Sequence, residues 1–257
     1  MITPLYGQLS PLRIPTGSRF ISADPDVVAY ILAVESADGQ QLESGVISAV
    51  DAFISGCKSD GIWSAIKSSC ILAGARSLSG ALKPLNGTAP TSSNFVSADY
   101  NRKMGLKGNG STKYLNSNRN NNSDPQNNKH LAVFMSETGT LALIGAGSTA
   151  QILEGAPLVY PRINSAGSVT AAFATGLIAA SRSVSTSTQY RINSAQSSMA
   201  ATSGTPASAA IYVFARGAAN SSTSARLSFY SIGESLDLAK LDTRVSTLIT
   251  ALAAAIP

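Results

Sequence analysis

Residues 225–256 read ARLSFYSIGESLDLAKLDTRVSTLITALAAAI, a short strand-like run that passes through Gly233 into a helical pattern. The helical part places apolar side chains three and four residues apart, at Leu238, Leu241, Val245, Leu248 and Leu252. This spacing puts all of them on one seam of a helix. Ser231 and Glu234 have the spacing of a capping box, which predicts that the helix begins next to Ser231.

Two partners fit this seam. In the first interpretation, the apolar side chains pack back on the chain's own β domain. In the second, the helix packs against copies of itself or against a larger assembly, and the same residues are oligomerisation contacts. The spacing suits both, so the sequence leaves the choice open.

The composition narrows the classes of function. Charged residues make up only 13% of the 257 residues, about half of the roughly 25% of an average globular protein. The net charge of +5 is spread without a basic run, so we expect no nucleic-acid partner. No segment approaches the ~18 consecutive apolar residues of a membrane span, so we expect no membrane partner. A weakly charged surface is typical of a protein that is embedded in an assembly or that faces sugars and solvent.

Residues 1–22 have the pattern of an extended arm. Several prolines exclude a helix, and apolar residues alternate with polar ones. We expect the arm to lie along its own domain or on a neighbour, with Tyr6 and Leu9 as attachment contacts. A frayed terminus is the alternative. The first residues have neither the basic nor the apolar region of a signal peptide, so we expect assembly in a cytoplasm.

Residues 23–88 are predicted to form a helical segment that ends in a junction. Asp24-Pro25 has the form of a helix start with proline in the first turn. The apolar stripe of residues 42–57 predicts a second, amphipathic helix. A short third helix is expected to begin at Ile62.

Residues 89–232 consist of short runs of β-type residues separated by Gly, Asn and Ser. Turn signals recur at roughly ten-residue spacing, and this texture predicts an antiparallel β-sandwich. Its expected strands cover residues 104–106, 112–115, 131–135, 140–144, 158–163, 171–178, 189–192, 209–215 and 225–230. The pentapeptide RINSA occurs at 162–166 and again at 191–195, and we interpret the copies as equivalent hairpin positions in one sheet. Residues 233–257 complete the chain as a C-terminal helix.

An asparagine-rich stretch, residues 116–128, is the main candidate for a binding site. Asn and Asp side chains build long ordered loops, and they also suit the hydroxyl groups of a sugar. In the second interpretation the glycan-binding residues are Asn120, Asn122 and Asp124, with Tyr100 and Tyr114 stacking on a sugar ring. Both tyrosines also fit ordinary packing on a sheet.

Patterns for metals, cofactors and catalysis are weak. A single carboxylate such as Asp124 makes a poor Ca²⁺ site, so we expect no metal and no cofactor. Cys57 and Cys70 lack a metal-ligand spacing and are expected to be buried thiols, with a disulfide as the alternative. His130 is the single histidine, and no nucleophile motif accompanies it. The acids of the sandwich region do not form the pair that a glycosidase needs. We therefore expect no enzyme.

Several segments together resemble one group of known proteins. They are GCKSDGIWSAIK at 56–67, LAGAR at 72–76, DYNRK at 99–103, GL at 105–106, GSTKYL at 110–115 and FYSIG at 229–233. They are similar to segments of tailed-bacteriophage virion proteins and prophage-derived proteins, where they belong to a concanavalin A-like (laminin-G-like) sandwich. The resemblance covers residues 24–256 and implies a mainly β fold. It implies a jelly roll of two antiparallel sheets, preceded by the helical segment and followed by the C-terminal helix. It carries over no named binding residues.

The resemblance implies a structural component of a phage virion that is assembled in the host cytoplasm. The arm and helices would attach it to other virion proteins of the tail, baseplate or capsid. The lectin-like sandwich predicts a tail fibre or receptor-binding protein that contacts host surface polysaccharide. The alternative is a capsid decoration (cement) protein without a ligand. Such proteins commonly work as trimers, so we expect a homotrimer with the Leu238–Leu252 seam as its contact.

Overall fold

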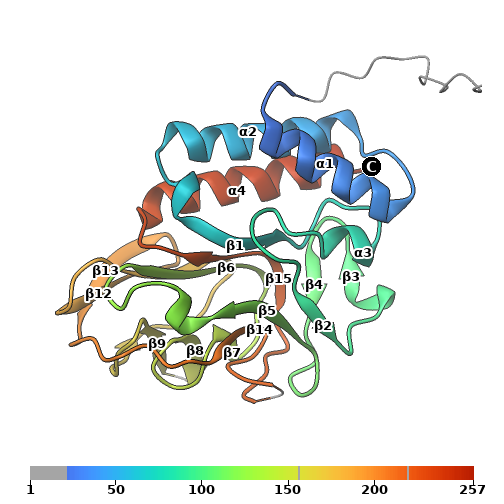
Figure 1. Ribbon diagram of the computed structural model, residues 1–257. Coiled ribbons are helices and arrows are strands. Elements are labelled where there is room, and N and C mark those ends of the chain that lie inside the picture. The colour runs from blue at the N-terminus through green and yellow to red at the C-terminus, as the bar shows by residue number, and fades with distance from the viewer. Residues whose placement is uncertain (1–21, 156, 219) are drawn as a thin grey trace, which may run out of the picture.

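The computed structural model describes residues 22–155, 157–218 and 220–257. These residues form three layers: helices cover one face of an antiparallel sheet, and a second antiparallel sheet packs against its other face (Figure 1). The predicted β-sandwich is confirmed at this level. The arm contacts expected at Tyr6 and Leu9 lie outside the described residues.

Sheet A lies directly under the helices. Its strands are β1 (Ile66–Ile71), β3 (Tyr100–Asn101), β4 (Gly105–Lys107), β6 (Lys129–Glu137), β11 (Gly176–Arg182), β12 (Ser187–Ile192), β13 (Ala195–Ala200) and β15 (Arg226–Gly233). The order is β13-β12-β11-β6-β15-β4-β3. β15 pairs with β6 on one side, and on the other it pairs with β4 at its start and with β1 towards its end. Residues 226–233 thus lie inside the sheet and join β6 to β4 and β1.

Sheet B forms the opposite layer. Its strands are β2 (Thr91–Ser93), β5 (Tyr114–Asn120), β7 (Leu141–Gly145), β8 (Gln151–Gly155), β9 (Leu158–Arg162), β10 (Val169–Thr170) and β14 (Ala210–Val213). The order is β10-β9-β8-β7-β14-β5-β2, with every pair antiparallel. The three long helices lie beyond sheet A, so they leave the outer face of sheet B uncovered (Figure 1).

The helix layer contains α1 (Pro25–Asp38), α2 (Ser44–Ser59) and α4 (Leu238–Ala255). α1 begins as predicted, because the Asp24 side chain caps it by accepting from the Asp26 N–H at 3.0 Å. The amphipathic α2 is also confirmed. Shorter helical elements are α3 (Leu78–Ala81) and the 3₁₀ turns Trp63–Ala65, Ser97–Asp99 and Asn121–Ser123.

The seam of α4 is buried inside its own chain. Leu238, Leu241, Val245, Leu248 and Leu252 are each at most 2% exposed. They pack in one apolar cluster with α1, α2 and residues of sheet A such as Ala132 and Phe229. The structure therefore shows the first interpretation of the seam. The second, in which these residues join copies of the chain, is corrected because they have no free surface in this conformation.

The predicted start of the terminal helix is wrong. Ser231 and Gly233 remain in β15, since their backbone pairs with β6 and β1. The helix begins only at Leu238, where the Asp237 carboxylate accepts from the N–H groups two and three residues later. Asp237, rather than Ser231, supplies the cap.

Two apolar clusters stabilise the layers. One lies between the helices and sheet A, where Phe53 of α2 meets Phe229 of β15 edge to face with ring centroids 5.7 Å apart. The other fills the space between the two sheets. Cys57 belongs to the first cluster and Cys70 to the second. Both are free, buried thiols, as expected, and no disulfide joins them.

Two local interpretations are wrong because long-range pairing decides the structure. After Ile62 the chain makes only a 3₁₀ turn and then enters β1, since β15 offers an antiparallel partner. The helical segment thereby contributes a strand to sheet A. In the asparagine-rich stretch, residues 116–120 belong to strand β5 rather than to a loop. Asn118 adopts φ 54° where the pairing of β5 with β14 shifts register.

The two RINSA copies lie in different sheets, contrary to the prediction. The first leads out of β9 in sheet B, and the second forms the turn between β12 and β13 in sheet A. They share a left-handed asparagine, Asn164 at φ 51° and Asn193 at φ 55°, a conformation that Asn tolerates better than most residues. The pentapeptide therefore specifies a local bend and not a place in a sheet.

Candidate functional site

Two of the candidate glycan-binding residues make contacts inside the molecule, Tyr100 while partly exposed and Asp124 while buried. The Tyr100 hydroxyl donates to the Ala75 carbonyl oxygen at 2.7 Å, and its ring packs against both apolar clusters. Asp124 is 2% exposed and lies between Arg119 and Lys129, at 2.5 and 2.9 Å. Burial acts to raise the pKa of Asp124, but the two cations outweigh it and hold the pKa below its usual range. Asp124 is therefore not available to a sugar, and its assignment is corrected. Tyr100 is partly exposed at the edge of sheet A, in a different sheet from the candidates of β5, and its glycan role stays a prediction.

The Asp124 ion pairs belong to a buried polar network at one end of the sandwich. Lys129 also donates to the Asn121 carbonyl oxygen, and the Asn121 side chain donates to that of Asn164. Nearby, the fully buried Arg182 donates to the backbone of residues 163, 184 and 201 and to the Thr188 hydroxyl. The side chains of this polar network bind one another and nearby backbone, so the network holds together the chain segments at this end of the sandwich.

His130 is also fully buried. Its Nδ1 lies 2.5 Å from the Glu234 carbonyl oxygen, which can only accept, and its Nε2 lies 2.7 Å from the Ser231 hydroxyl. Both ring nitrogens thus have partners in a neutral imidazole. Burial lowers the pKa of His130 to about 4. This Ser–His pair has no exposed surface, which agrees with a structural role for the histidine.

The outer face of sheet B carries a continuous row of cross-strand neighbours. Residues such as Leu115, Val213 and Ile152 point into the core between the sheets, so the residues adjacent to them along each strand point outward. The outward row consists of Thr91, Asn116, Tyr212, Gly145, Gln151 and Arg162, each paired in register with the next. It extends about 24 Å, from five strand spacings of ~4.8 Å.

Partly exposed tyrosine rings border this row. Tyr114 meets Tyr212 edge to face, with centroids 5.5 Å apart and an interplanar angle of 74°. Tyr160 lies beside Arg162, whose Cζ is 4.6 Å from the ring centroid. Tyr114 is thus the one residue of the predicted set that the structure places among these rings. Asn120 and Asn122 are exposed at and just beyond the end of β5, outside the row.

Gln151 and Arg162 are neighbours in the row, but of the two only Arg162 has hydrogen-bond partners for its side chain among the described residues. Gln151 is 2% exposed, and its Oε1 has no partner among the described residues. Arg162 donates from Nε to the Gly167 carbonyl oxygen at 2.7 Å and from Nη1 to the Ser148 carbonyl oxygen at 2.8 Å. Burial lowers the pKa of Arg162, Tyr160 acts to raise it, and the nearby positive charge of Arg216 lowers it.

Neither the row nor its tyrosine border contains a carboxylate. Glu154, on β8, is 9% exposed, and its Oε1 accepts from the Phe173 N–H at 3.0 Å. Asp99 and Glu137 are each ion-paired to a Lys or Arg. The face therefore offers aromatic rings, amides and guanidinium groups, which suit binding better than acid–base chemistry.

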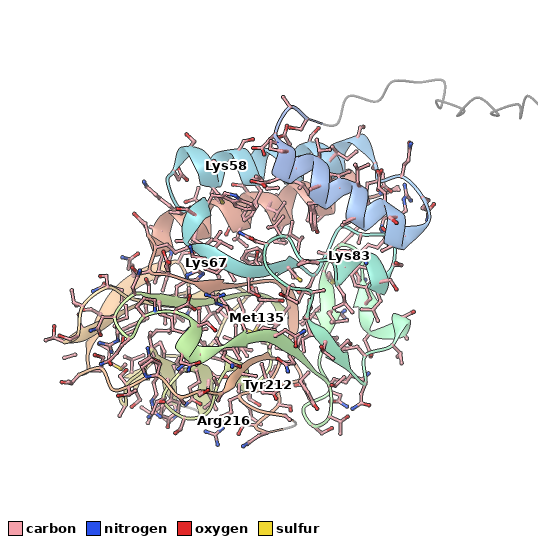
Figure 2. The ribbon with its side chains drawn as sticks, in the orientation of Figure 1. Lys58, Lys67, Lys83, Met135, Tyr212 and Arg216 are labelled. Carbon is pink, nitrogen blue, oxygen red and sulfur yellow. The ribbon has the colours of Figure 1, made fainter. Side chains whose placement is uncertain are left out.

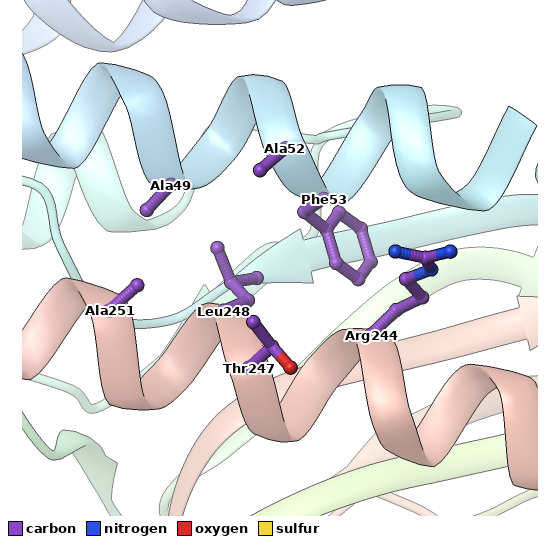
Figure 3. Close-up of a pocket in the computed structure, with 7 residues that line it drawn as sticks. All are labelled: Ala49, Ala52, Phe53, Arg244, Thr247, Leu248 and Ala251. Carbon is purple, nitrogen blue, oxygen red and sulfur yellow. The ribbon is translucent and has the colours of Figure 1, made fainter. Parts of the chain in front are cut away.

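A small groove between α2 and α4 is another feature with a defined lining. Figure 3 shows Phe53, Leu248 and Arg244 facing one another between the two helices, together with alanines and a threonine. Its volume is about 70 Å³, well below the ~300–1,000 Å³ of ordinary ligand pockets. Arg244 is already ion-paired to Asp60 at 2.7 Å. The groove is a gap in helix packing and is too small for a sugar.

Comparison with known protein families and with curated proteins shows no match to this sequence. No helix in the described ranges is long and apolar enough to cross a membrane. The same residues contain no group of three or more His, Cys, Asp or Glu side chains arranged as metal ligands. The functional interpretation therefore depends on the geometry of the chain itself.

The sequence prediction missed most of the sheet B face, including Tyr212, Gln151 and Arg162. One signal was present: in Tyr114-Leu115-Asn116 and in Ile211-Tyr212-Val213, polar residues alternate with apolar ones and so share a face. What sequence could not supply was the strand order. β5 and β14 are neighbours although nearly a hundred residues separate them.

Proposed function

We propose that the chain is a non-enzymatic structural protein that binds glycans on the outer face of sheet B. The observation that carries this proposal is the row of Asn, Tyr, Gln and Arg side chains bordered by Tyr114 and Tyr160. The proposal replaces Tyr100, in sheet A, and the buried Asp124 with residues on the outer face of sheet B. It retains Tyr114.

The chemistry of the face fits a sugar chain. Aromatic rings offer flat apolar surfaces with a polar hydroxyl at the edge, and a pyranose ring has apolar C–H faces of similar size. Amide side chains both donate and accept hydrogen bonds, as sugar hydroxyls do. The ~24 Å row is long enough for several sugar units. Figure 2 labels Tyr212 in sheet B, on the side of the molecule opposite the helices.

The virion role extends this proposal. The sequence resembles phage virion proteins with a concanavalin A-like jelly roll, and the two antiparallel sheets are compatible with that fold. In this role the helix layer faces other virion proteins, and sheet B faces host surface polysaccharide. The chain then acts as a tail fibre or related receptor-binding protein.

Substitution of Tyr212 tests the glycan site. A glycan array of the full chain selects a bound polysaccharide, which is then titrated against Tyr212→Ala and Tyr212→Phe. We expect the alanine variant to bind roughly tenfold more weakly, about 1.4 kcal/mol, because a stacking surface is lost. The phenylalanine variant keeps the ring and should bind within about threefold of the parent.

The contrary results are equally specific. Equal binding by the parent and by Tyr212→Ala would place the glycan elsewhere on the molecule. Absence of binding to any glycan on the array, or to host cells, would contradict the proposal and leave the decoration-protein alternative. Immunogold labelling of particles separates those roles, since decoration predicts label on the head and receptor binding predicts label on the tail.

A further inference from the structure

The described arginines fall into distinct groups. Most lie against a carboxylate, namely Arg76, Arg102, Arg119, Arg191, Arg226 and Arg244. Arg182 is buried and donates to neutral acceptors. Among the described residues this leaves Arg162 and Arg216, neither of which has an ion-pair partner there. Among the described residues, these two are therefore the partly exposed arginines without a counter-ion.

Both arginines lie at the same corner of sheet B, the turn between β7 and β8. The Gly147 N–H donates to the Arg216 carbonyl oxygen at 2.8 Å, and Arg162 Nη1 donates to the carbonyl oxygen of the next residue, Ser148, also at 2.8 Å. In Figure 2 Arg216 is labelled near Tyr212 at the rim of the molecule. The corner is thus continuous with the aromatic row.

The corner has unused donors and one unused acceptor. The Arg216 side chain is partly exposed and makes no hydrogen bond with the described residues, and Nη2 of Arg162 makes none either. The neighbouring Gln151 Oε1 is buried without a partner. Two like charges without a counter-ion repel each other, and an anion between them relieves this repulsion.

We propose that this corner binds the carboxylate of an acidic sugar, of the uronic-acid class, within the bound polysaccharide. The inference builds on the proposed glycan site and specifies its ligand. Guanidinium groups hold carboxylates through paired, charge-assisted hydrogen bonds, which Arg162 Nη2 and Arg216 can supply. The tyrosines of the row hold the neighbouring sugar units.

Polygalacturonate and its methyl ester form a matched pair of probes, because they share a backbone and differ only in the carboxylate charge. We measure both by isothermal titration calorimetry with the full chain and with Arg216→Gln. The parent is expected to bind the acid at least about tenfold more tightly than the ester. Arg216→Gln should lose this preference and bind both forms alike. Binding of the acid should also weaken as salt is raised.

Lys103→Gln is the control, because it removes the same charge from an exposed residue between β3 and β4, in sheet A. It should leave the preference intact. A similar loss with Lys103→Gln would show that net charge, and not this corner, attracts the acid. Equal binding of acid and ester by the parent would also overturn the inference, while a weakening of both by Tyr212→Ala would still support the proposed glycan site. If neither probe and no glycan on the array binds, both proposals fail.

Discussion

Burial of His130 couples the stability of the protein to pH. Its pKa is about 4 in the folded chain and about 6.5 in an unfolded one. The unfolded state therefore binds a proton first as the pH falls, and the free energy of unfolding decreases between these two values. We expect the protein to be about 2 kcal/mol less stable near pH 5 than near pH 7.5, at 1.36 kcal/mol per pKa unit.

Urea unfolding at both pH values measures this difference. His130 is the single histidine, so few other groups titrate in this window, and His130→Asn is the appropriate control. The variant should be less stable at neutral pH but should lose most of the pH dependence. If the free energy of unfolding of the variant depended on pH as strongly as that of the parent, other titrating groups would be responsible.

The roles of single residues could be predicted where they depend on local sequence, but not where they depend on residues that folding brings together. A structural His130 could be inferred because no triad partners accompany it in the sequence. The burial of Asp124 could not, because its counter-ions Arg119 and Lys129 converge on it only when β5 and β6 are in place. The same holds for Arg162 and Arg216, which lie in separate segments until the β7–β8 turn joins them.

At the scale of elements, the longest apolar strands were predicted, whereas β8 and β13 were missed. β6 and β15 were recognised, whereas β13 has the sequence AQSSMA and little strand propensity. It forms because Asn193 and Ser194, at φ 55° and 58°, make a two-residue hairpin turn that lays it against β12. Helices were more predictable because their periodicity is local, although the start of α4 depended on how far β15 continued.

The hairpin fixes which amides of β13 face the open edge of sheet A. Beside a two-residue turn the flanking pair, Ile192 and Ala195, is hydrogen-bonded, and the pattern then alternates. Ser197 therefore faces β12, and Ser198 faces the edge. The bond from the Ala201 N–H to the Thr186 carbonyl oxygen at 2.9 Å keeps the same alternation.

Proline substitutions test this register. Ser197→Pro should destabilise the protein by about 2–3 kcal/mol, because it removes a ladder hydrogen bond within the sheet. Ser198→Pro should cost less than about 1 kcal/mol, since edge positions tolerate proline. Thermal unfolding of both variants shows which one is less stable, and Ser198→Ala is the control for the lost hydroxyl. The reverse order would show that the register is shifted by one residue.

For the whole molecule, the sequence predicted the layers but not how tightly they are joined. The sandwich and the helical segments were read as successive parts of the chain. In the structure, β1 from the helical segment pairs with β15, and residues of sheet A belong to the helix-side cluster on one face and to the inter-sheet cluster on the other. Because both cores share one sheet, neither layer can unfold without exposing the other.

This shared sheet predicts the outcome of shortening Leu241, which is fully buried in the α4 seam. Leu241→Ala should lower the free energy of unfolding by about 3 kcal/mol. Trp63, the single tryptophan, packs against the helix-side cluster, so its fluorescence follows that layer. Far-UV circular dichroism follows the sheets as well. Both signals should shift together to lower urea concentration.

Leu32→Ala is the matched control, because Leu32 is 51% exposed on α1 and its truncation should change stability by no more than about 0.5 kcal/mol. Two separated transitions in the parent would mean that the helix layer unfolds on its own, which the shared sheet does not allow. Gel filtration with light scattering tests the other use of the seam. If Leu241→Ala converted an oligomer to a monomer at an unchanged unfolding midpoint, the seam would join copies of the chain. Because its side chains are already enclosed by α1, α2 and sheet A, we expect the loss to appear in stability instead.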